Sequence, residues 1–322
     1  MTLLDKLLQL LVAVVVFAAV MGVVLLVVGR AKGRRADVVS GVAFTAPALL
    51  LLLIGLLYPA ARTAVQSVLD ARSAGFVGLD NYVRIFTQPD LVVVMRNTLL
   101  WVVITPILST AIGLVYAVLV DRTRFEAAAK ALIFLPMAIS FVGAAIIWKF
   151  VYEYRPNQQN IQQIGLLNQI LVWLGFEPVN FILAEPWNNL LLIVVMIWIQ
   201  AGFAMTILSA AIKAIPSDII EAARLDGVGG LRMFFYITLP SIRPAVVVVI
   251  TAISIAVLKV FDIVRTMTGG QFGTSVVANE FYVQSFRLSD LGMGSALAMI
   301  LFVLVVPIVI YNVRQMRKVD AR

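Results

Sequence analysis

The feature that most constrains this chain is a series of seven long apolar stretches. Each runs for roughly 20 residues, about the length of helix that crosses the hydrocarbon core of a bilayer. They lie near residues 7–28, 40–60, 93–118, 131–151, 188–211, 244–264 and 292–312. A membrane-spanning β-barrel would instead show short segments of alternating polarity. Because 62% of the 322 residues are hydrophobic and 13% are charged, the sequence predicts an all-α, polytopic helical membrane protein.

The composition also excludes several kinds of site. The chain has no cysteine and no histidine, so it has no disulfide, cysteine nucleophile, Cys/His zinc site or histidine acid–base chemistry. The pattern Gly-x-x-x-x-Gly-Lys-Ser/Thr does not occur, which excludes a nucleotide-binding loop of that kind. The net charge of +8 fits basic residues at the cytoplasmic ends of membrane helices, and we expect no nucleic-acid partner.

The positions of Lys and Arg predict how the chain crosses the membrane, since short cytoplasmic loops carry an excess of both. Four groups of basic residues fall in alternate connections: Arg30, Lys32, Arg34 and Arg35; Arg122, Arg124 and Lys130; Lys213, Arg224, Arg232 and Arg243; and Arg314, Arg317, Lys318 and Arg322. With seven spans, this pattern places the N-terminus outside and the C-terminus in the cytoplasm.

The first apolar run divides the chain into two parts. It is too long for a signal peptide, and basic residues follow it where a small-residue cleavage site would be needed. We therefore expect a transmembrane helix and a basic loop over residues 1–36 and a six-helix core over residues 37–322. If the first run is not a true span, the six core helices keep the same orientation.

Two connections on the outer side are long and poor in basic residues. Within residues 61–92, the stretch 81–86 fits a short amphipathic helix at the membrane interface. Residues 152–187 are rich in Asn and Gln, and we expect Trp173 and Trp187 to act as interfacial anchors.

The cytoplasmic segment 213–243 is the most informative part of the sequence, and it predicts two short helices. Ser217 or Asp218 is expected to cap the first helix, with acidic residues in its first turn. Gly227 can take a positive φ and end that helix. Pro240 and Pro244 separate the apolar second half from the next span. Ala222 and Ala223 offer a surface without bulk, where another protein can approach closely.

This segment resembles the permease signature of binding-protein-dependent ATP-binding-cassette (ABC) importers. The family pattern is Glu-Ala-Ala, three residues, Gly, nine residues, Ile, one residue and Leu-Pro. Every fixed position is matched here, by Glu221, Ala222, Ala223, Gly227, Ile237, Leu239 and Pro240. In that family the loop is a coupling helix that docks into a cleft on the ATPase subunit, and the resemblance implies the same role for residues 213–243.

A second Glu-Ala-Ala stretch, Glu126-Ala127-Ala128, does not complete this pattern. The position six residues after Glu126 is Leu132 rather than Gly. We interpret this stretch as the cytoplasmic start of the fourth span, supported by an i,i+4 pair between Glu126 and Lys130.

Three further stretches resemble the carbohydrate branch of the same family. They are residues 78–82 followed by Asn97-Thr98, residues 259–262 running into Thr268-Gly269-Gly270, and residues 292–296. The likeness covers about residues 40–315 and favours the first of the two permeases that such systems pair. The family's usual Gly-Pro after the glycine turn is replaced by Gln271-Phe272-Gly273.

The resemblance implies a non-catalytic permease subunit in the bacterial plasma (inner) membrane. Such a subunit forms the translocation path for a sugar, either an oligosaccharide or an alpha-glucoside, that an extracytoplasmic solute-binding protein delivers. Its further partners are a second permease in a heterodimer, two ATP-binding-cassette ATPase subunits and membrane lipid. ATP and Mg are used by the ATPase, and no cofactor is expected on this chain.

Polar residues inside the membrane are candidates for the substrate path, because they are costly in lipid. Gln200 and Phe203 share a face of the fifth span and suit sugar hydroxyls and the apolar face of a pyranose, although aromatic residues in helices more often serve packing. Lys259 and Asp262 are three residues apart in the sixth span. They either line the path or hold the helix bundle together as a structural pair. Val257, on the same span, completes the candidate set.

Other functions remain open at this point. Within the same class, the solute could be glycerol-phosphate or another polar compound. An ion-coupled secondary transporter would often show inverted repeats and broken helices, and the sequence shows neither. A membrane enzyme would need catalytic groups at one membrane face, where Glu221 and Asp226 form the only close acidic pair on the inside.

Overall fold

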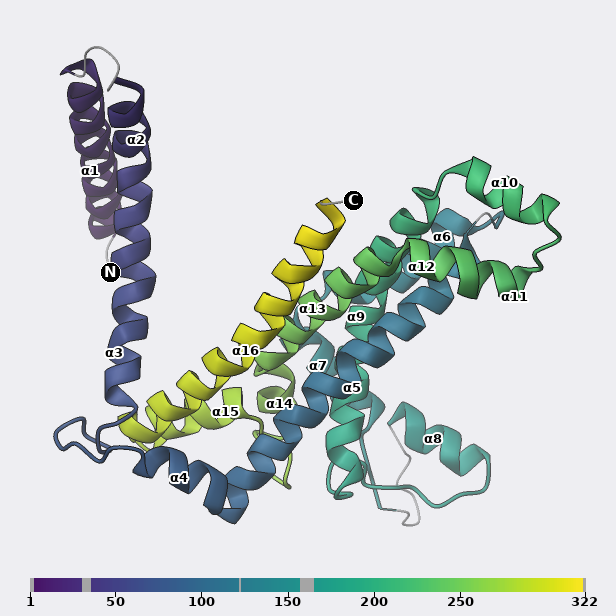
Figure 1. Ribbon diagram of the computed structural model, residues 1–322. Coiled ribbons are helices and arrows are strands. Elements are labelled where there is room, and N and C mark those ends of the chain that lie inside the picture. Colours follow the sequence, from purple (N-terminus) through teal and green to yellow (C-terminus); the bar gives the residue numbers. More distant parts are fainter. Residues whose placement is uncertain (1–2, 31–35, 122, 157–164, 321–322) are drawn as a thin grey trace. The chain divides into compact units, whose positions relative to one another are not determined.

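The computed structural model describes residues 3–30, 36–121, 123–156 and 165–320, and within these ranges it is helical (Figure 1). In these ranges a single antiparallel bridge, between Leu69 and Phe76, is the only β-type pairing. Five of the described helices are long and apolar enough to cross a membrane, or up to seven if each of two bent helix pairs counts as one span. The predicted fold class, an all-α polytopic membrane protein, is confirmed.

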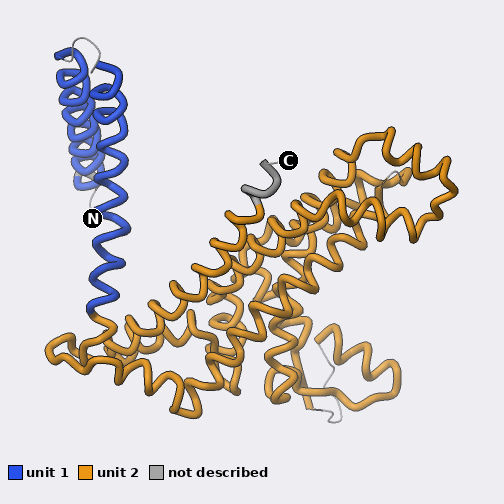
Figure 2. The backbone as a smooth tube through the Cα atoms, viewed as in Figure 1, with its two compact units in different colours: residues 1–65 blue, residues 66–322 orange. Residues whose placement is uncertain are grey.

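The chain forms two compact units, residues 1–65 and residues 66–322 (Figure 2). In the first unit, α1 (Leu3–Arg30) packs against α2 (Ala36–Leu52). The second helix continues through a π-helical turn, η2 (Leu53–Leu57), into α3 (Tyr58–Gln66). Most of the apolar side chains of this unit are exposed, as lipid-facing helices require. The predicted division between an N-terminal helix and loop (residues 1–36) and a six-helix core (residues 37–322) concerns membrane topology rather than compactness. It stays a prediction.

The centre of the second unit is the contact between two long helices, α5 (Pro89–Val120) and α9 (Trp187–Lys213). A Cβ atom on Gly113 would lie 2.5 Å from the Cβ of Ala204 and 2.7 Å from the backbone nitrogen of Met205. The two backbones therefore approach this closely only because residue 113 has no side chain. α13 (Arg243–Leu258) packs on α5 and on α16 (Leu291–Asp320), which completes the bundle.

The fourth predicted span, residues 131–151, is bent. α6 (Glu126–Phe134) and the 3-10 turn η3 (Leu135–Ala138) meet α7 (Phe141–Val151) at 102°. Pro136 lies in the turn, and Ser140 caps α7 by accepting a hydrogen bond from the Gly143 nitrogen at 3.1 Å. The expectation of unbroken spans is therefore wrong here, so a broken helix does not single out a secondary transporter.

The sixth predicted span, residues 244–264, is shorter than expected. α13 ends at Leu258, and a separate short helix, α14 (Asp262–Met267), follows it. Between them the backbone leaves helical geometry at Phe261, where φ is −130°. The start of α13 is also marked by a bend of 68° relative to the preceding helical segment, Gly230–Ser241, next to the predicted separators Pro240 and Pro244.

The short helices gather at the two ends of the second unit (Figure 1). One end carries α4 (Asp80–Thr87), α8 (Leu166–Trp173) and α15 (Val277–Tyr282) with its π-helical turn η5 (Val283–Arg287). The other end carries α10 (Ser217–Leu225) and the segment made of α11 (Gly230–Met233), η4 (Phe234–Thr238) and α12 (Leu239–Ser241). α4 confirms the short helix predicted near residues 81–86. The C-terminal end of α16 points toward the end that holds α10 (Figure 1), as the predicted topology requires.

Replacing Gly113 with leucine should destabilise the second unit, because the new side chain would collide with the backbone of α9. Overpacking of this kind costs about 1–3 kcal/mol. The measurement is the thermal unfolding midpoint of the detergent-solubilised chain. The matched control is Ala111→Leu, two residues away on the exposed side of α5. Equal midpoints for the two variants would contradict the close contact at Gly113.

Candidate functional site

The segment 213–243 contains the predicted pair of short helices, but its first helix starts differently from the prediction. Pro216, with φ −54° and ψ 136°, is the N-cap of α10, and no side chain caps the helix. Ser217 and Asp218 instead lie inside the first turn, so the prediction that one of them is the cap is wrong. Asp218 still places a carboxylate near the positive end of the helix dipole.

The end of α10 is formed as predicted, by Gly227. Its φ is +73°, in the left-handed region that favours glycine. The Gly227 nitrogen donates to the Arg224 oxygen at 3.0 Å, and the Val228 nitrogen donates to the Ala223 oxygen at 3.0 Å. These two bonds are a Schellman motif, which satisfies the last carbonyls of the helix and turns the chain sharply.

The signature positions lie in this helical pair, and their exposure differs. Ala222 is exposed, as expected for a surface that another protein approaches, whereas Ala223 is buried within the chain itself. The expectation that both alanines face outward is therefore wrong for Ala223, which packs on the inner side of α10. Glu221 and Pro240 are exposed.

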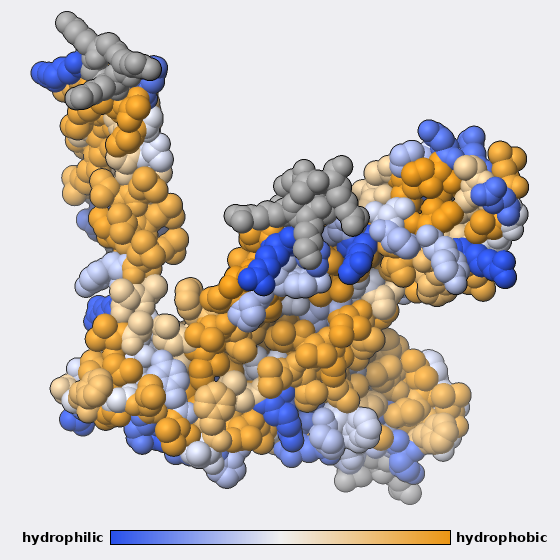
Figure 3. Space-filling model, viewed as in Figure 1, coloured by the Kyte–Doolittle hydropathy of each residue, from blue (hydrophilic) through white to orange (hydrophobic). Residues whose placement is uncertain are grey.

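Large apolar side chains in and around the same segment are exposed. Leu225 is 89% exposed, Leu231 79% and Tyr236 78%. Figure 3 shows hydrophobic residues interspersed with hydrophilic ones at this end of the second unit. Large exposed apolar residues rimmed by polar groups are typical of protein–protein or membrane contact sites, so this surface is a candidate contact site.

The candidate path residues lie in or near α9 and α13. Gln200 is 8% exposed and Val257 is buried, while Phe203 is half-buried. Within the described residues the Gln200 amide makes no hydrogen bond, so a ligand hydroxyl could satisfy it.

The predicted pairing of Lys259 with Asp262 on one helix face is wrong. Lys259 is the C-cap of α13, and Asp262 is the first residue of α14. The break at Phe261 separates the two side chains, and no ion pair joins them in the part of the chain that the structure describes.

Two asparagines that the sequence analysis left without a role hold a loop at the opposite end of the unit from α10. Asn97 Nδ2 donates to the carbonyl oxygens of Gly273, at 2.6 Å, and Ser275, at 3.0 Å. Asn188 Nδ2 donates to the Phe272 oxygen at 2.8 Å. The sequence signal for Asn188 is a polar amide just inside an apolar span, where a buried polar group needs partners.

A cavity of about 870 Å³ lies between this loop and the first turns of α5 and α9. Charged side chains in its wall are Asp90, Arg96, Glu185 and Glu280. Asn189, also in the wall, accepts a hydrogen bond from Trp101 Nε1 at 2.8 Å. The cavity therefore has charged and amide groups among the apolar residues of its wall, and it lies at the end where the short helices α4 and α8 gather.

The stretches 78–82 and 292–296, which the sequence analysis related to one family, also meet at this end. Asn81 Nδ2 donates to the carbonyl oxygens of Ser67, at 3.0 Å, and Leu69, at 2.8 Å. A Cβ on Gly292 would lie 2.2 Å from the same Leu69 oxygen. The loop at residues 67–77 thus joins the start of α4 to the start of α16.

The Asp70 carboxylate organises that loop. It accepts hydrogen bonds from the backbone nitrogens of Ala74 (2.8 Å), Gly75 (3.0 Å) and Arg72 (3.1 Å). These bonds, that from Ala74 foremost, lower the pKa of Asp70 below its usual value.

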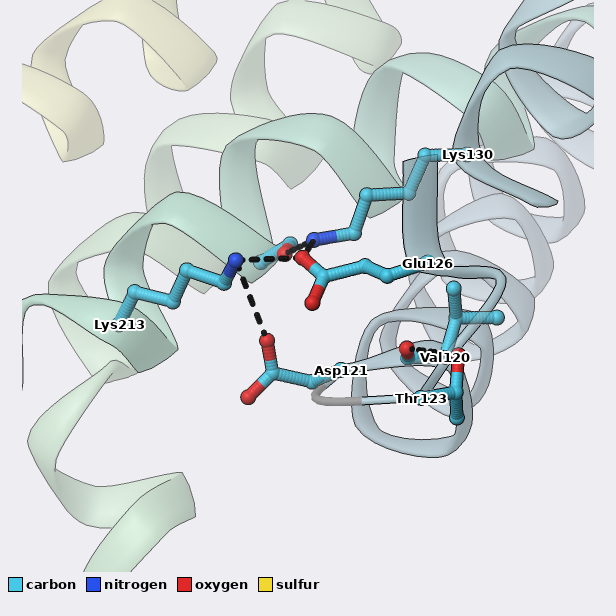
Figure 4. Close-up of polar contacts among 7 residues, drawn as sticks. Val120, Asp121, Thr123, Glu126, Lys130 and Lys213 are labelled. Atoms are coloured by element: carbon cyan, nitrogen blue, oxygen red, sulfur yellow. Dashed lines mark hydrogen bonds and ion pairs between the residues drawn. The ribbon is translucent and has the colours of Figure 1, made fainter. Parts of the chain in front are cut away.

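A charge cluster lies at the end that holds α10 (Figure 4). Lys130 Nζ lies 2.6 Å from Glu126 Oε1, which confirms the predicted i,i+4 pair. The structure adds Lys213, which contacts the same Glu126 oxygen and lies 3.6 Å from Asp121 Oδ1. Lys130 also donates to Ser209 Oγ. In the described residues, no group of three or more His, Cys, Asp or Glu side chains is arranged to hold a metal ion.

Comparison with known proteins gives consistent results. The family model described as "Binding-protein-dependent transport system inner membrane component" matches residues 93–319. The osmoprotective compounds uptake permease protein GgtC of Synechocystis sp. is 51% identical over 274 residues, which cover 85% of this chain and 98% of that protein. The alpha-glucoside transport system permease protein AglF of Rhizobium meliloti is 48% identical over 272 residues, 84% of this chain and 80% of that protein. A chain in a solved bacterial alginate ABC transporter complex has the same fold, with a TM-score of 0.73 and 23% identity over 86% of this chain and 93% of that one.

Replacing Gly227 with alanine should weaken the C-terminal end of α10, because an L-residue pays about 1–2 kcal/mol in left-handed geometry. Gly229→Ala is the matched control. A Cβ meets nothing within 4 Å at either glycine, but Gly229 has φ −71°. Hydrogen exchange of the α10 amides should become faster in the first variant only. Equal exchange in both variants would contradict the Schellman ending.

Proposed function

The chain belongs to the family of inner membrane components of binding-protein-dependent transport systems, and on this premise we propose that it forms half of the translocation path of a sugar importer. As a member of that family it is a non-catalytic permease subunit of an ABC importer. We infer that its partners are a second permease, two ATPase subunits and an extracytoplasmic binding protein.

A solute rich in hydroxyl groups is supported by the relatives and by the path residues. The AglF protein is described as an alpha-glucoside transporter permease and is 48% identical. Gln200, buried and without a hydrogen-bond partner in the described residues, offers an amide to a hydroxyl group. The neighbouring Phe203 ring suits the apolar face of a pyranose. The similarity to the osmoprotective compounds permease favours a second candidate class, small osmoprotective solutes.

We infer that α10 and the segment 230–241 form the coupling element. The observation that carries this inference is the set of free apolar side chains, Leu225, Leu231 and Tyr236, around a helix whose ends are fixed by Pro216 and Gly227. Closure of the ATPase dimer on ATP would move this element and turn the bundle from inward-facing to outward-facing. Since a ligand shifts an equilibrium only by its differential affinity for two states, the docked contacts must differ between them.

The same inference gives the orientation in the bacterial inner membrane. The end with α10 and the C-terminal end of α16 lies on the cytoplasmic side, and the end with α4, α8 and the cavity lies outside. Lys and Arg placement supports this orientation. The cavity then lies at the face that the binding protein approaches.

Replacing Gln200 with leucine should reduce sugar uptake without reducing stability. The side chain loses no hydrogen bond within the described chain, while a ligand hydroxyl loses its partner, which should raise the apparent KM of uptake roughly five- to tenfold. Met196→Leu, one turn away and also buried, is the control and should leave uptake and the unfolding midpoint unchanged. Unaltered uptake by Gln200→Leu would remove Gln200 from the path.

The proposed function is tested in proteoliposomes that contain the complete complex. Sugar-loaded binding protein should stimulate ATP hydrolysis, and ATP should drive uptake of a labelled alpha-glucoside. Leu225→Asp should abolish co-purification of the ATPase, because a charge replaces an apolar contact in the docking surface.

The control for Leu225→Asp is Phe76→Asp, at another exposed apolar residue near the opposite end of the unit; this variant should still retain the ATPase. Uptake by this chain without an ATPase would instead favour an ion-coupled transporter. Full ATPase retention by Leu225→Asp would remove Leu225 from the docking surface.

A further inference from the structure

The charge cluster next to the proposed coupling element joins α6 to α9, two helices that are far apart in sequence. Glu126, at the start of α6, is shared by Lys130 of the same helix and by Lys213 at the end of α9 (Figure 4). Asp121, in the turn before α6, gives Lys213 a second carboxylate at 3.6 Å. The Glu126 and Asp121 side chains are mostly buried, so water screens these charges less than on an open surface.

The cluster is the last of three contacts along one face of α9. A Cβ on Gly202 would lie 2.5 Å from the Ile133 oxygen of α6, so the two backbones touch there. Ser209 accepts a hydrogen bond from Lys130, and Lys213 contacts Glu126. Gly202, Ser209 and Lys213 are seven and four residues apart, which places them on one side of a helix. α6 and the second half of α9 are therefore fastened along their shared length.

The position of the cluster relates this fastening to transport. Lys213 is the last residue of α9, and α10 begins at Ser217, so Lys213 lies where the chain passes from α10 into the bundle. The contact between Glu126 and Lys213 joins α9 to α6, and we call it the joint. Beyond the joint, α6 leads through η3 into α7, which it meets at 102°. A shift of α6 would therefore change the direction in which α7 is pushed.

We propose that Glu126 is a positioning residue that joins α6 to α9 as one rigid arm and so transmits the movement of α10 to the bent pair α6 and α7. This proposal rests on the proposed coupling function. It also gives the Glu126-Ala127-Ala128 stretch, which lacks the signature glycine, a separate role as the fixed side of the joint. The joint stays closed throughout the transport cycle, because the backbone contact at Gly202 leaves no room for one helix to slide past the other.

Glu126→Gln in the complete reconstituted complex tests the joint. The variant removes the carboxylate that two lysines share, yet it leaves the docking surface of α10 unchanged. The ATPase should still co-purify, while the sugar moved per ATP hydrolysed and the stimulation of hydrolysis by loaded binding protein should each fall about tenfold, within the usual range of coupling between sites. Lys213→Met, whose side chain is half-exposed, should give the same loss and serves if Glu126→Gln fails to fold.

The matched control is Arg124→Gln, which removes an exposed charge from the same turn. Arg124 makes no ion pair within the described residues, and we expect wild-type coupling in this variant. Unchanged coupling in both Glu126→Gln and Lys213→Met, with the ATPase retained, would overturn the proposal.

The absence of native cysteine allows a rescue experiment. The double variant Glu126→Cys/Lys213→Cys should be uncoupled when reduced, and a short bis-maleimide, which adds to one thiol at each end, should restore stimulated hydrolysis to at least half of the wild-type rate. A crosslinked complex that stays uncoupled or is blocked would show that the joint must open, which contradicts the proposal. If wild-type complex moves no sugar but its hydrolysis still responds to binding protein and to Glu126→Gln, the substrate assignment fails and the joint stands.

Discussion

The arrangement of the second unit depends on the close approach of α5 and α9. Because lipid tails are as apolar as leucine side chains, there is little hydrophobic driving force for two helices to associate in a membrane. Close van der Waals packing has to stabilise the contact instead. Gly113 allows this packing, because any Cβ there would lie 2.5 Å from Ala204. With these two long helices fixed against each other, α6 and α13 pack on a rigid surface, and the loops at both ends have defined starting points.

Helix breaks in this bundle occur where other parts of the chain can satisfy the backbone. Non-helical backbone at membrane depth is tolerated only where protein or a water-filled cavity covers it. The bend between α6 and α7 is covered on one side by α9, and Ser140 supplies the cap that starts α7. The loop around Gly273, at the end opposite α10, is held by side-chain amides, because Asn97 and Asn188 donate hydrogen bonds to its carbonyl oxygens.

The sequence predicted the fold class, the approximate spans and the ending of α10, because these features have local causes. Apolar length sets a span, and a glycine with positive φ ends a helix wherever it stands, as Gly227 does. The bends were not predicted, because hydropathy reports how apolar a stretch is and carries almost no information on the direction of the helix axis. Pro136 lies within an apolar stretch and therefore did not interrupt the pattern. Lys259 and Asp262 looked like an i,i+3 pair only on the assumption of a continuous helix, which Phe261 breaks. The contact of Asn97 with Gly273 and that of Glu126 with Lys213 depend on tertiary packing. No periodic pattern in the sequence predicts such long-range contacts.

The bare apolar side chains around α10 have a consequence for how the cell makes this protein. Under the proposed coupling role, a permease synthesised in excess of its ATPase would present Leu225, Leu231 and Tyr236 to the cytosol without cover. Surfaces of that kind attract chaperones, proteases and other unassembled chains. Steady accumulation then requires matched synthesis of the two subunits, or rapid removal of whichever is in surplus. The proposed docking surface would thus also make the level of this chain depend on the supply of its partner.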